Sequence, residues 1–225
     1  MEYDDIIKRL ESLADPKRLE GMERYAIAAR TAYGVSVPDL RKIAREIRVD
    51  HDLAQQLWAS NIRETRILAS MIDDPEIVTE EQMERWVRDF DSWEICDQCC
   101  MNLFERSKLA YQKCLEWSSR EEEFVKRAGF ALMARLAVSD KEADDELFEN
   151  FLHIIEGQAS DDRNFVKKAI NWALRQIGKR NIALNKKAIA AAERIGALDS
   201  RSARWVASDA IRELTSEAVQ KRLRG

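Results

Sequence analysis

Two stretches, FVKRAGFALMARLA at residues 124–137 and FVKKAINWALRQIG at residues 165–178, repeat one pattern of apolar and basic residues. The second stretch begins 41 residues after the first. In both, apolar residues recur at three- and four-residue spacing, which predicts a helix with one buried face. The same helix used twice at this interval indicates an internal structural repeat.

Similar inner-helix patterns occur elsewhere, in IRETRILASMI (62–72), WEICDQCCMNLF (93–104) and ARWVASDAIREL (203–214). Spacings of about 30–41 residues are typical of HEAT-like repeats, in which each helical pair buries its apolar side against the next pair. We therefore predict an all-α fold, a right-handed superhelical solenoid of HEAT-like antiparallel helix pairs that forms a single domain over residues 1–225. The helices are expected over residues 4–14, 18–31, 38–48, 50–59, 62–72, 79–89, 92–105, 107–117, 120–137, 144–156, 161–178, 182–195 and 201–213.

Local signals support several of these helix starts. Pro38 fits the first turn of its helix, where a missing amide hydrogen costs nothing. Thr79 and Ser119 precede acidic residues and are expected to cap the helices that follow them.

The composition is that of a globular, cytoplasmic protein. Apolar residues make up 45% of the chain, with seven glycines and three prolines. No apolar run reaches the length of a membrane span, and the acidic start MEYDDIIKRL does not resemble a signal peptide. In that compartment the four cysteines, Cys96, Cys99, Cys100 and Cys114, are expected to be reduced thiols.

The net charge of −4 conceals a strong asymmetry. Residues 163–225 contain 15 Lys and Arg against 5 Asp and Glu, a balance of +10, so residues 1–162 carry −14. A basic C-terminal third fits a nucleic-acid partner, although segregated solvated helix faces would give the same totals.

In a helical solenoid the inner helices line one wall, so equivalent positions of successive repeats come together. Arg66, Arg127 and Lys168 occupy comparable places near the starts of their helices, and Asp97 stands in the same row. A row of cations would suit a phosphate backbone, and the lone carboxylate among them requires an explanation. The cations expected to contact DNA are Arg66, Lys126, Arg127, Lys167, Lys168 and Arg175.

The chain resembles the AlkD family of DNA alkylation-repair glycosylases. The resemblance runs over nearly the whole chain, from YGVSVPDLR (33–41) through DSWEICD (91–97) and VKRAGF (125–130) to VKKAINWALR (166–175). It implies a HEAT-like enzyme that acts on double-stranded DNA containing N3- or N7-alkylated purines, without metal or cofactor, and we expect a monomer. The catalytic residues it implies are Asp97, Trp93, Arg127 and Trp172. Ser92 departs from the family pattern, which has a tryptophan there.

Physical chemistry agrees with these roles. Trp93 and Asp97 are four residues apart, so they share a helix face about 6 Å apart. Breaking the glycosidic bond of a cationic purine leaves positive charge on the sugar, which a fixed carboxylate stabilises, and the same carboxylate can position a water. Tryptophan faces attract the cationic nucleotide, and Arg127 would hold a phosphate.

Other interpretations of the same residues remain open. Tryptophans at helical spacing can simply be core, Asp97 and Arg127 can form a structural ion pair, and Arg127 and Lys168 can be solvated charges. Cys96-x-x-Cys99-Cys100 has too few companions for a closed zinc site, since only Cys114, His51 and His153 remain. The competing function is a non-catalytic HEAT-like scaffold that binds DNA or protein.

Overall fold

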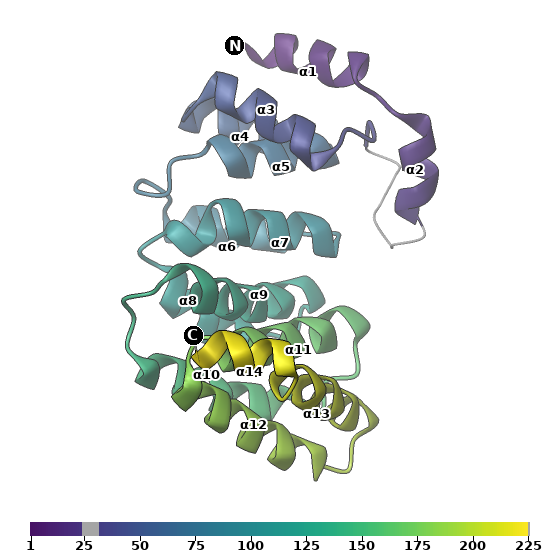
Figure 1. Cartoon of the computed structure of the whole chain (residues 1–225). Helices are drawn as coiled ribbons and strands as arrows, with labels where there is room; N and C mark the ends of the chain where they lie inside the picture. The colour runs from purple at the N-terminus through teal and green to yellow at the C-terminus, as the bar shows by residue number, and fades with distance from the viewer. Residues whose placement is uncertain (24–31, 225) are drawn as a thin grey trace. The chain divides into compact units, whose positions relative to one another are not determined.

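The computed structural model describes residues 1–23 and 32–224, and within them all regular secondary structure is helical, with no strand (Figure 1). This confirms the predicted all-α class. The chain divides into two compact units, Met1–Leu109 and Ala110–Gly225. That residues 1–225 form a single domain stays a prediction.

The first unit is built around α5. Its elements are α1 (Tyr3–Ser12), α2 (Pro16–Glu23), α3 (Val37–Ile47), α4 (His51–Ala59), α5 (Arg63–Ile72), α6 (Glu80–Arg88), α7 (Trp93–Asn102) and a short 3-10 helix (Phe104–Arg106). α5 is buried along almost its whole length and packs against α3, α4 and α7. Near the C-terminal end of α4, Trp58 stacks on Trp86 of α6 with ring centroids 3.9 Å apart.

The second unit is a stack of antiparallel helical pairs with α11 at its centre. Its elements are α8 (Ala110–Ser118), α9 (Glu123–Ser139), α10 (Asp145–Gln158), α11 (Asn164–Gly178), α12 (Ile182–Gly196), α13 (Arg201–Leu214) and α14 (Glu217–Arg224). α11 packs against α9, α10, α12 and α13. The two repeated stretches of sequence are therefore neighbours in space, and Phe124 and Phe165, which open them, have ring centroids 5.5 Å apart.

A glycine sets the closest approach in this unit. A Cβ added to Gly129 of α9 would lie 2.6 Å from the backbone nitrogen of Ser118 in α8. Only glycine lets the two helix backbones come this near.

Most predicted helix boundaries agree with the structure within a few residues. Pro38 lies in the first turn of α3, and the Thr79 hydroxyl accepts a hydrogen bond from the Gln82 amide, as expected. The prediction for Ser119 is wrong: its hydroxyl donates to the Glu116 carbonyl, and α9 begins after Glu122 without a side-chain cap. The predicted helix 18–31 corresponds to α2 up to Glu23, and its remainder lies outside the described residues.

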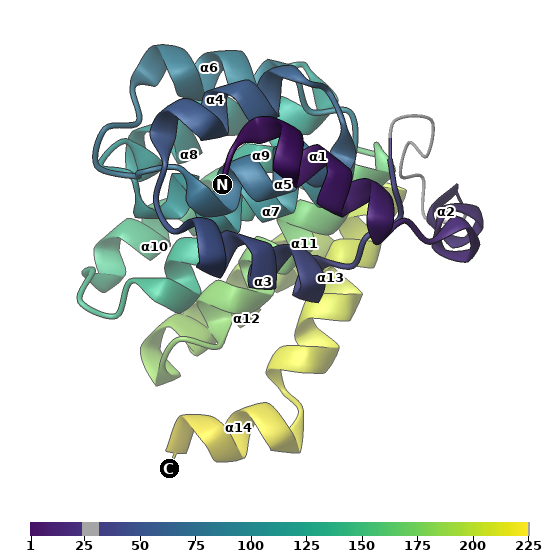
Figure 2. The ribbon, with the colours of Figure 1, turned by 90° about the horizontal axis from the view of Figure 1, so that it is seen from above.

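Two elements differ from the prediction. The single helix expected over 92–105 ends at Asn102 and continues as the 3-10 turn, because Leu103 and Phe104 both turn into the core. The C-terminal helix α14 was not predicted at all; it extends from the end of α13 (Figure 2) and buries only Val219.

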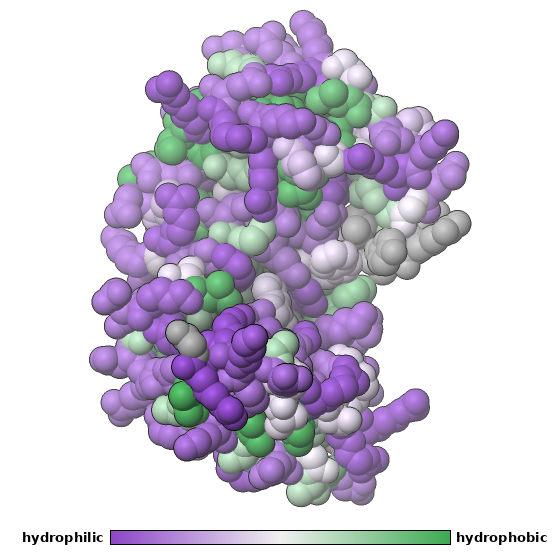
Figure 3. Space-filling view, in the orientation of Figure 1, coloured by the Kyte–Doolittle hydropathy of each residue, from purple (hydrophilic) through white to green (hydrophobic). Residues whose placement is uncertain are grey.

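The surface of both units is mostly hydrophilic on the face shown in Figure 3, with apolar side chains in small patches. None of the helices in the described ranges combines the length and the apolar character that crossing a bilayer requires.

Candidate functional site

The N-terminal half of α7 carries Trp93 and Asp97. Ser92, fully buried, caps the helix by accepting a hydrogen bond from the Ile95 amide at 3.4 Å. The serine that replaces an aromatic of the resembled family therefore has a structural role, because it fixes where the helix starts and which way its first turns face.

α7 has two distinct faces. Its buried face consists of Ile95, Cys96, Cys99 and Cys100. Trp93 and Asp97 lie one turn apart on the opposite, half-buried face. Both side chains keep contact with solvent, which a pair that acts on a substrate requires.

A buried ionic network holds the start of α7 in place. Arg63 of α5 donates two hydrogen bonds to the Glu94 carboxylate, from Nε and Nη2, each at 2.7 Å. Its Nη1 contacts the Glu64 carboxylate at 2.9 Å. Burial alone would lower the pKa of Arg63. The hydrogen bonds and charge of Glu94 and, to a smaller extent, those of Glu64 outweigh burial and raise this pKa. Arg63 thus stays charged and ties α5 to the residue next to Trp93.

Glu64 anchors the loop before α3 from the same network. Its fully buried carboxylate accepts hydrogen bonds from the amides of Tyr33, Gly34 and Val35 at 2.9–3.1 Å. Gly34 has φ +77°, and a Cβ there would lie 2.4 Å from the Asp15 carbonyl oxygen. Sequence reasoning missed this network, although two adjacent charges at the head of a largely apolar helix were a signal for it.

Arg66, expected to contact DNA, is held inside the first unit. It is 7% exposed, and its guanidinium lies 5.3 Å from the Trp58 ring centroid. Its Nη1 donates to the Asp89 carbonyl at 2.9 Å. These contacts give Arg66 a structural role in joining α5 to the end of α6.

In the second unit, Lys126 and Arg127 join the start of α9 to the start of α11. Lys126 Nζ lies 3.2 Å from the Asp161 carboxylate. Arg127 Nη1 donates to the Phe165 carbonyl at 2.6 Å. Burial raises the pKa of Asp161, but hydrogen bonds from Arg163 and Lys126 outweigh it and hold the pKa below its usual value. Both cations are largely buried and firmly oriented.

α11 carries the remaining predicted residues. Trp172 is half-buried, and Lys168 is exposed, with no ion-pair partner among the described residues. Arg175 forms an ion pair with Glu213 of α13, which also accepts a hydrogen bond from Lys179 at 2.6 Å. Of the six predicted DNA contacts, Lys168 is thus the most accessible.

The structure therefore places the predicted site in two groups. Trp93 and Asp97 share one face of α7 in the first unit. Arg127 and Trp172 lie on α9 and α11, two helices that pack together in the second unit.

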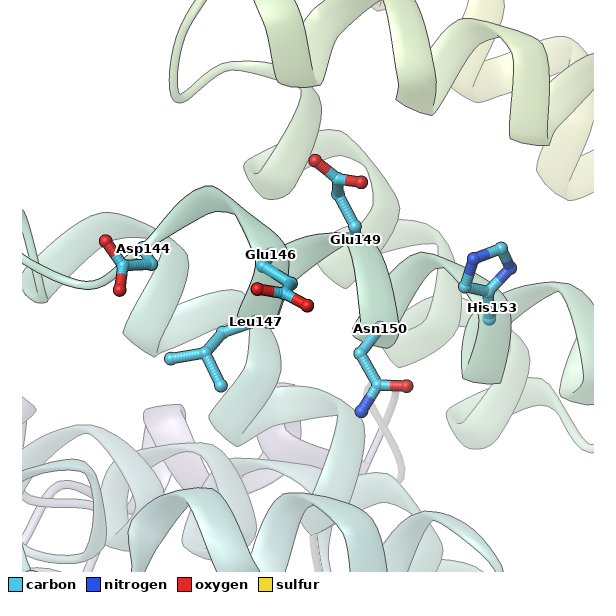
Figure 4. Close-up of a pocket in the computed structure, with 6 residues that line it drawn as sticks. All are labelled: Asp144, Glu146, Leu147, Glu149, Asn150 and His153. Atoms are coloured by element: carbon cyan, nitrogen blue, oxygen red, sulfur yellow. The ribbon is translucent and has the colours of Figure 1, made fainter.

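An acidic pocket of about 660 Å³ lies along α10 and was not predicted. Its lining residues are Asp144, Glu146, Leu147, Glu149, Asn150 and His153 (Figure 4). Glu149 and Asn150 point to opposite sides of the helix in this view, and Glu149 forms an ion pair with Lys187. Three carboxylates repel phosphate, so this pocket is not a place for a DNA backbone.

The four cysteines are buried and form no disulfide. Burial raises the pKa of the Cys99, Cys100 and Cys114 thiols well above the usual value. Within residues 1–23 and 32–224, no group of three or more His, Cys, Asp or Glu side chains is arranged to hold a metal ion.

Comparison with known proteins gives three findings. A family model described as DNA alkylation repair enzyme matches residues 6–214. Two uncharacterized proteins, Lin0241 of Listeria innocua and Lmo0209 of Listeria monocytogenes, are 23% and 22% identical over 198 residues, which is 86% of each chain.

The third finding is a solved structure from a new family of proteins related to the HEAT-like repeat DNA glycosylases with affinity for branched DNA structures. It matches with a TM-score of 0.84 and 19% identity, covering 99% of this chain and 96% of that one. The similarity shows that this chain has the HEAT-like repeat fold.

Proposed function

The chain belongs to the DNA alkylation repair enzyme family, and from this premise we propose that it is a DNA N-glycosylase. Its substrates are double-stranded DNA with cationic N3- or N7-alkylated purines, whose N-glycosidic bond it hydrolyses. The family membership confirms the resemblance to AlkD-type proteins in the sequence. The glycosylase activity and its residues are the proposal.

The observation that carries the proposal is the half-buried Trp93 and Asp97 pair on α7. A carboxylate in a partly desolvated position interacts more strongly with a nearby cation than one in bulk water does. As the bond to the purine breaks, positive charge grows on the deoxyribose, and the Asp97 carboxylate stabilises it. The same oxygen atoms can orient the water that attacks the sugar carbon.

The alkylated purine is already a good leaving group because its ring carries a positive charge. The site therefore needs no general acid on the base, and the proposed residues include none. Trp93 and Trp172 offer aromatic faces to the cationic nucleotide, an attraction of about 0.5–2 kcal/mol for each ring.

Arg127 is suited to hold a phosphate beside the lesion. Its hydrogen bond to the Phe165 carbonyl fixes the guanidinium on the folded chain before DNA binds. A preorganised guanidinium loses little side-chain entropy when it binds an anion, and its planar donors match phosphate oxygens. Lys126 is held in a similar way by its ion pair with Asp161. Lys168 is exposed and adds a positive charge that can reach the DNA backbone.

The test is excision of N7-methylguanine from a duplex, scored as abasic sites under single-turnover conditions. Asp97→Asn keeps the size of the side chain and removes its charge. Loss of one such electrostatic contribution costs about 2.7–4 kcal/mol, or roughly a hundred- to thousandfold in rate. The variant should still bind the duplex.

Asp52→Asn is the matched control, because it removes one charge from an exposed position at the start of α4 in the same unit. The control should excise at the parental rate. Thermal unfolding of both variants shows whether the fold is kept. Parental excision by Asp97→Asn would show that Asp97 has no catalytic role.

One observation favours a second function, binding to branched DNA without excision. The solved relative that shares this fold is described by its affinity for branched DNA structures. This function predicts that the parent protein binds a four-way junction more tightly than a duplex and produces no abasic sites. Excision that depends on Asp97 would decide for the glycosylase.

A further inference from the structure

Trp205 of α13 is an exposed tryptophan in the basic part of the chain. Of the six tryptophans, Trp58, Trp86 and Trp117 are buried, and Trp93 and Trp172 are half-buried. Trp205 is 41% exposed. Burying the exposed surface of this ring against another molecule would release ordered water and favour binding.

Lys167 of α11 orients this ring. Its Nζ lies 5.3 Å from the Trp205 ring centroid, within the range of a cation–π contact. α11 and α13 pack together, so lysine and tryptophan belong to the same rigid pair of helices. The ring is thus held on the surface and is not folded into the core.

A pocket of about 400 Å³ lies beside the ring. It is lined by Asp162, Lys167, Arg201, Ser202 and Trp205. The Ser202 hydroxyl is already used, since it donates to the Asp161 carbonyl at 2.6 Å. Two cations against one carboxylate leave the pocket positive.

Exposed cations continue the positive charge outside the pocket. Arg204 is exposed next to Trp205 on α13, with Asp199 3.4 Å away, and Lys168 lies next to Lys167 on α11. Arg201 is exposed and has no ion-pair partner in the described parts of the chain. Charges of this sign beside an aromatic face match one chemical unit, a nucleotide, whose phosphate binds the cations while its base stacks on the ring.

We propose that Trp205, with Lys167 and Arg201, is a stacking platform for an unpaired nucleotide of DNA. Bases inside a duplex are stacked on both faces, so only a base outside the helix can use the ring. The platform therefore adds affinity for DNA that carries a single-stranded flap or gap, over and above duplex binding. This inference rests on DNA binding as part of the proposed function, and it does not depend on the excision chemistry.

The experiment compares the binding of the whole chain to a fluorescent duplex and to the same duplex with a short oligothymidine flap. Trp205→Ala should weaken binding to the flap DNA about fivefold or more, the effect of losing one base–aromatic stack, and should change duplex binding less than twofold. Trp205→Phe, which keeps an aromatic face, should recover most of the lost affinity.

Ile182→Ala is the matched control, because Ile182 is also a large exposed apolar side chain on a helix of the same unit. It should leave both affinities unchanged. Poly-glutamate, a polyanion without bases, should compete with the flap DNA only weakly, whereas free oligothymidine should compete well. In the Trp205→Ala variant, oligothymidine should compete less well than it does for the parent protein, and the weak competition by poly-glutamate should be unchanged.

The outcomes separate this inference from the proposed function. If Trp205→Ala binds flap and duplex DNA as the parent does, or loses both equally, Trp205 is not a base platform, whereas DNA binding stands. If the parent binds neither DNA, the proposed function fails at its first step. If poly-glutamate competes as well as oligothymidine does and its competition depends on Trp205, the surface serves an acidic protein partner and the inference is overturned.

Discussion

Replacing Gly129 with alanine should destabilise the second unit, because α9 passes so close to α8 at this residue. The added Cβ would lie 2.6 Å from the Ser118 nitrogen and 3.0 Å from both the Ser118 Cα and the Trp117 carbonyl carbon. All three atoms are backbone, so no side chain can rotate away. Restoring an ordinary contact of 3.4 Å requires the two helices to separate by about 0.8 Å.

The magnitude follows from two opposing contributions. Overpacking a close-packed site costs about 1–3 kcal/mol, and rigid backbone neighbours place this case at the upper end. Alanine in place of glycine inside a helix returns about 1 kcal/mol through its better helix propensity. We therefore expect the free energy of unfolding to fall by about 1–2 kcal/mol.

Gly157→Ala is the matched control. Gly157 also lies within a helix, α10, but a Cβ there would meet nothing within 4 Å. That variant gains the helix propensity of alanine without a steric clash, so it should be more stable than the parent. The gain should be only about 0.5 kcal/mol, because Gly157 lies near the end of the helix. Urea unfolding followed by far-UV circular dichroism measures both. A Gly129→Ala protein as stable as Gly157→Ala would refute the packing argument.

Three further predictions concern the ionic contacts. Glu64→Ala should lower the free energy of unfolding by about 3–5 kcal/mol, because the amides of Tyr33, Gly34 and Val35 lose their acceptor and Arg63 keeps only Glu94 as a carboxylate partner. A loss below about 1 kcal/mol in urea titrations would contradict this. The Tyr111 hydroxyl donates to Asp140 at 2.7 Å, and this bond lowers the pKa of Asp140 against the opposing effect of burial. The hydrogen bond therefore stabilises the folded protein fully above the unfolded pKa of Asp140, and this stabilisation is lost as pH falls through the lowered folded pKa. Tyr111→Phe should lower the free energy of unfolding by about 1 kcal/mol at neutral pH and by less in acid. An equal loss at both pH values would argue against this. Finally, duplex affinity should fall steeply with salt, and Lys168→Gln should reduce the slope of log K against log[salt] by about one phosphate contact, whereas an unchanged slope would exclude Lys168 from the DNA face.

The fold could be predicted from the sequence because its repeat is present in local patterns. The spacing of apolar residues and the cap at Thr79 are properties of short segments, and short segments determine where helices lie. α14 was not predicted because its apolar pattern is too short to recognise. It has eight residues, is strongly basic and buries only Val219.

The site could be predicted only in part. Trp93 and Trp172 are half-buried, and their functional role stays a prediction. The partners of the cations could not be predicted, because they are distant in sequence and are often backbone atoms. Arg66 binds the carbonyl of Asp89, and Arg127 binds a carbonyl 38 residues away. Periodicity shows that a charge faces inward but not which oxygen atom receives it.

Trp205 lies off the apolar face of α13. The buried face of that helix includes Ala203, Val206, Ala207 and Ala210, whereas the residues three and four positions away from Trp205 are all polar. The pattern therefore predicts that the ring faces outward, but it does not show that Lys167 of α11 lies beside the ring.

The buried thiols of α7 have a consequence for the chemistry around the protein. Alkylating agents that damage DNA also attack thiolates, the most nucleophilic side chains of a protein at neutral pH. Cys99 and Cys100 are fully enclosed, and burial raises their pKa, so they remain as thiols. A methyl group added to either would have to fit into a close-packed interior. Burial of these thiols therefore protects the helix that carries Asp97 from modification by the same methylating agents that create the proposed substrate of the protein.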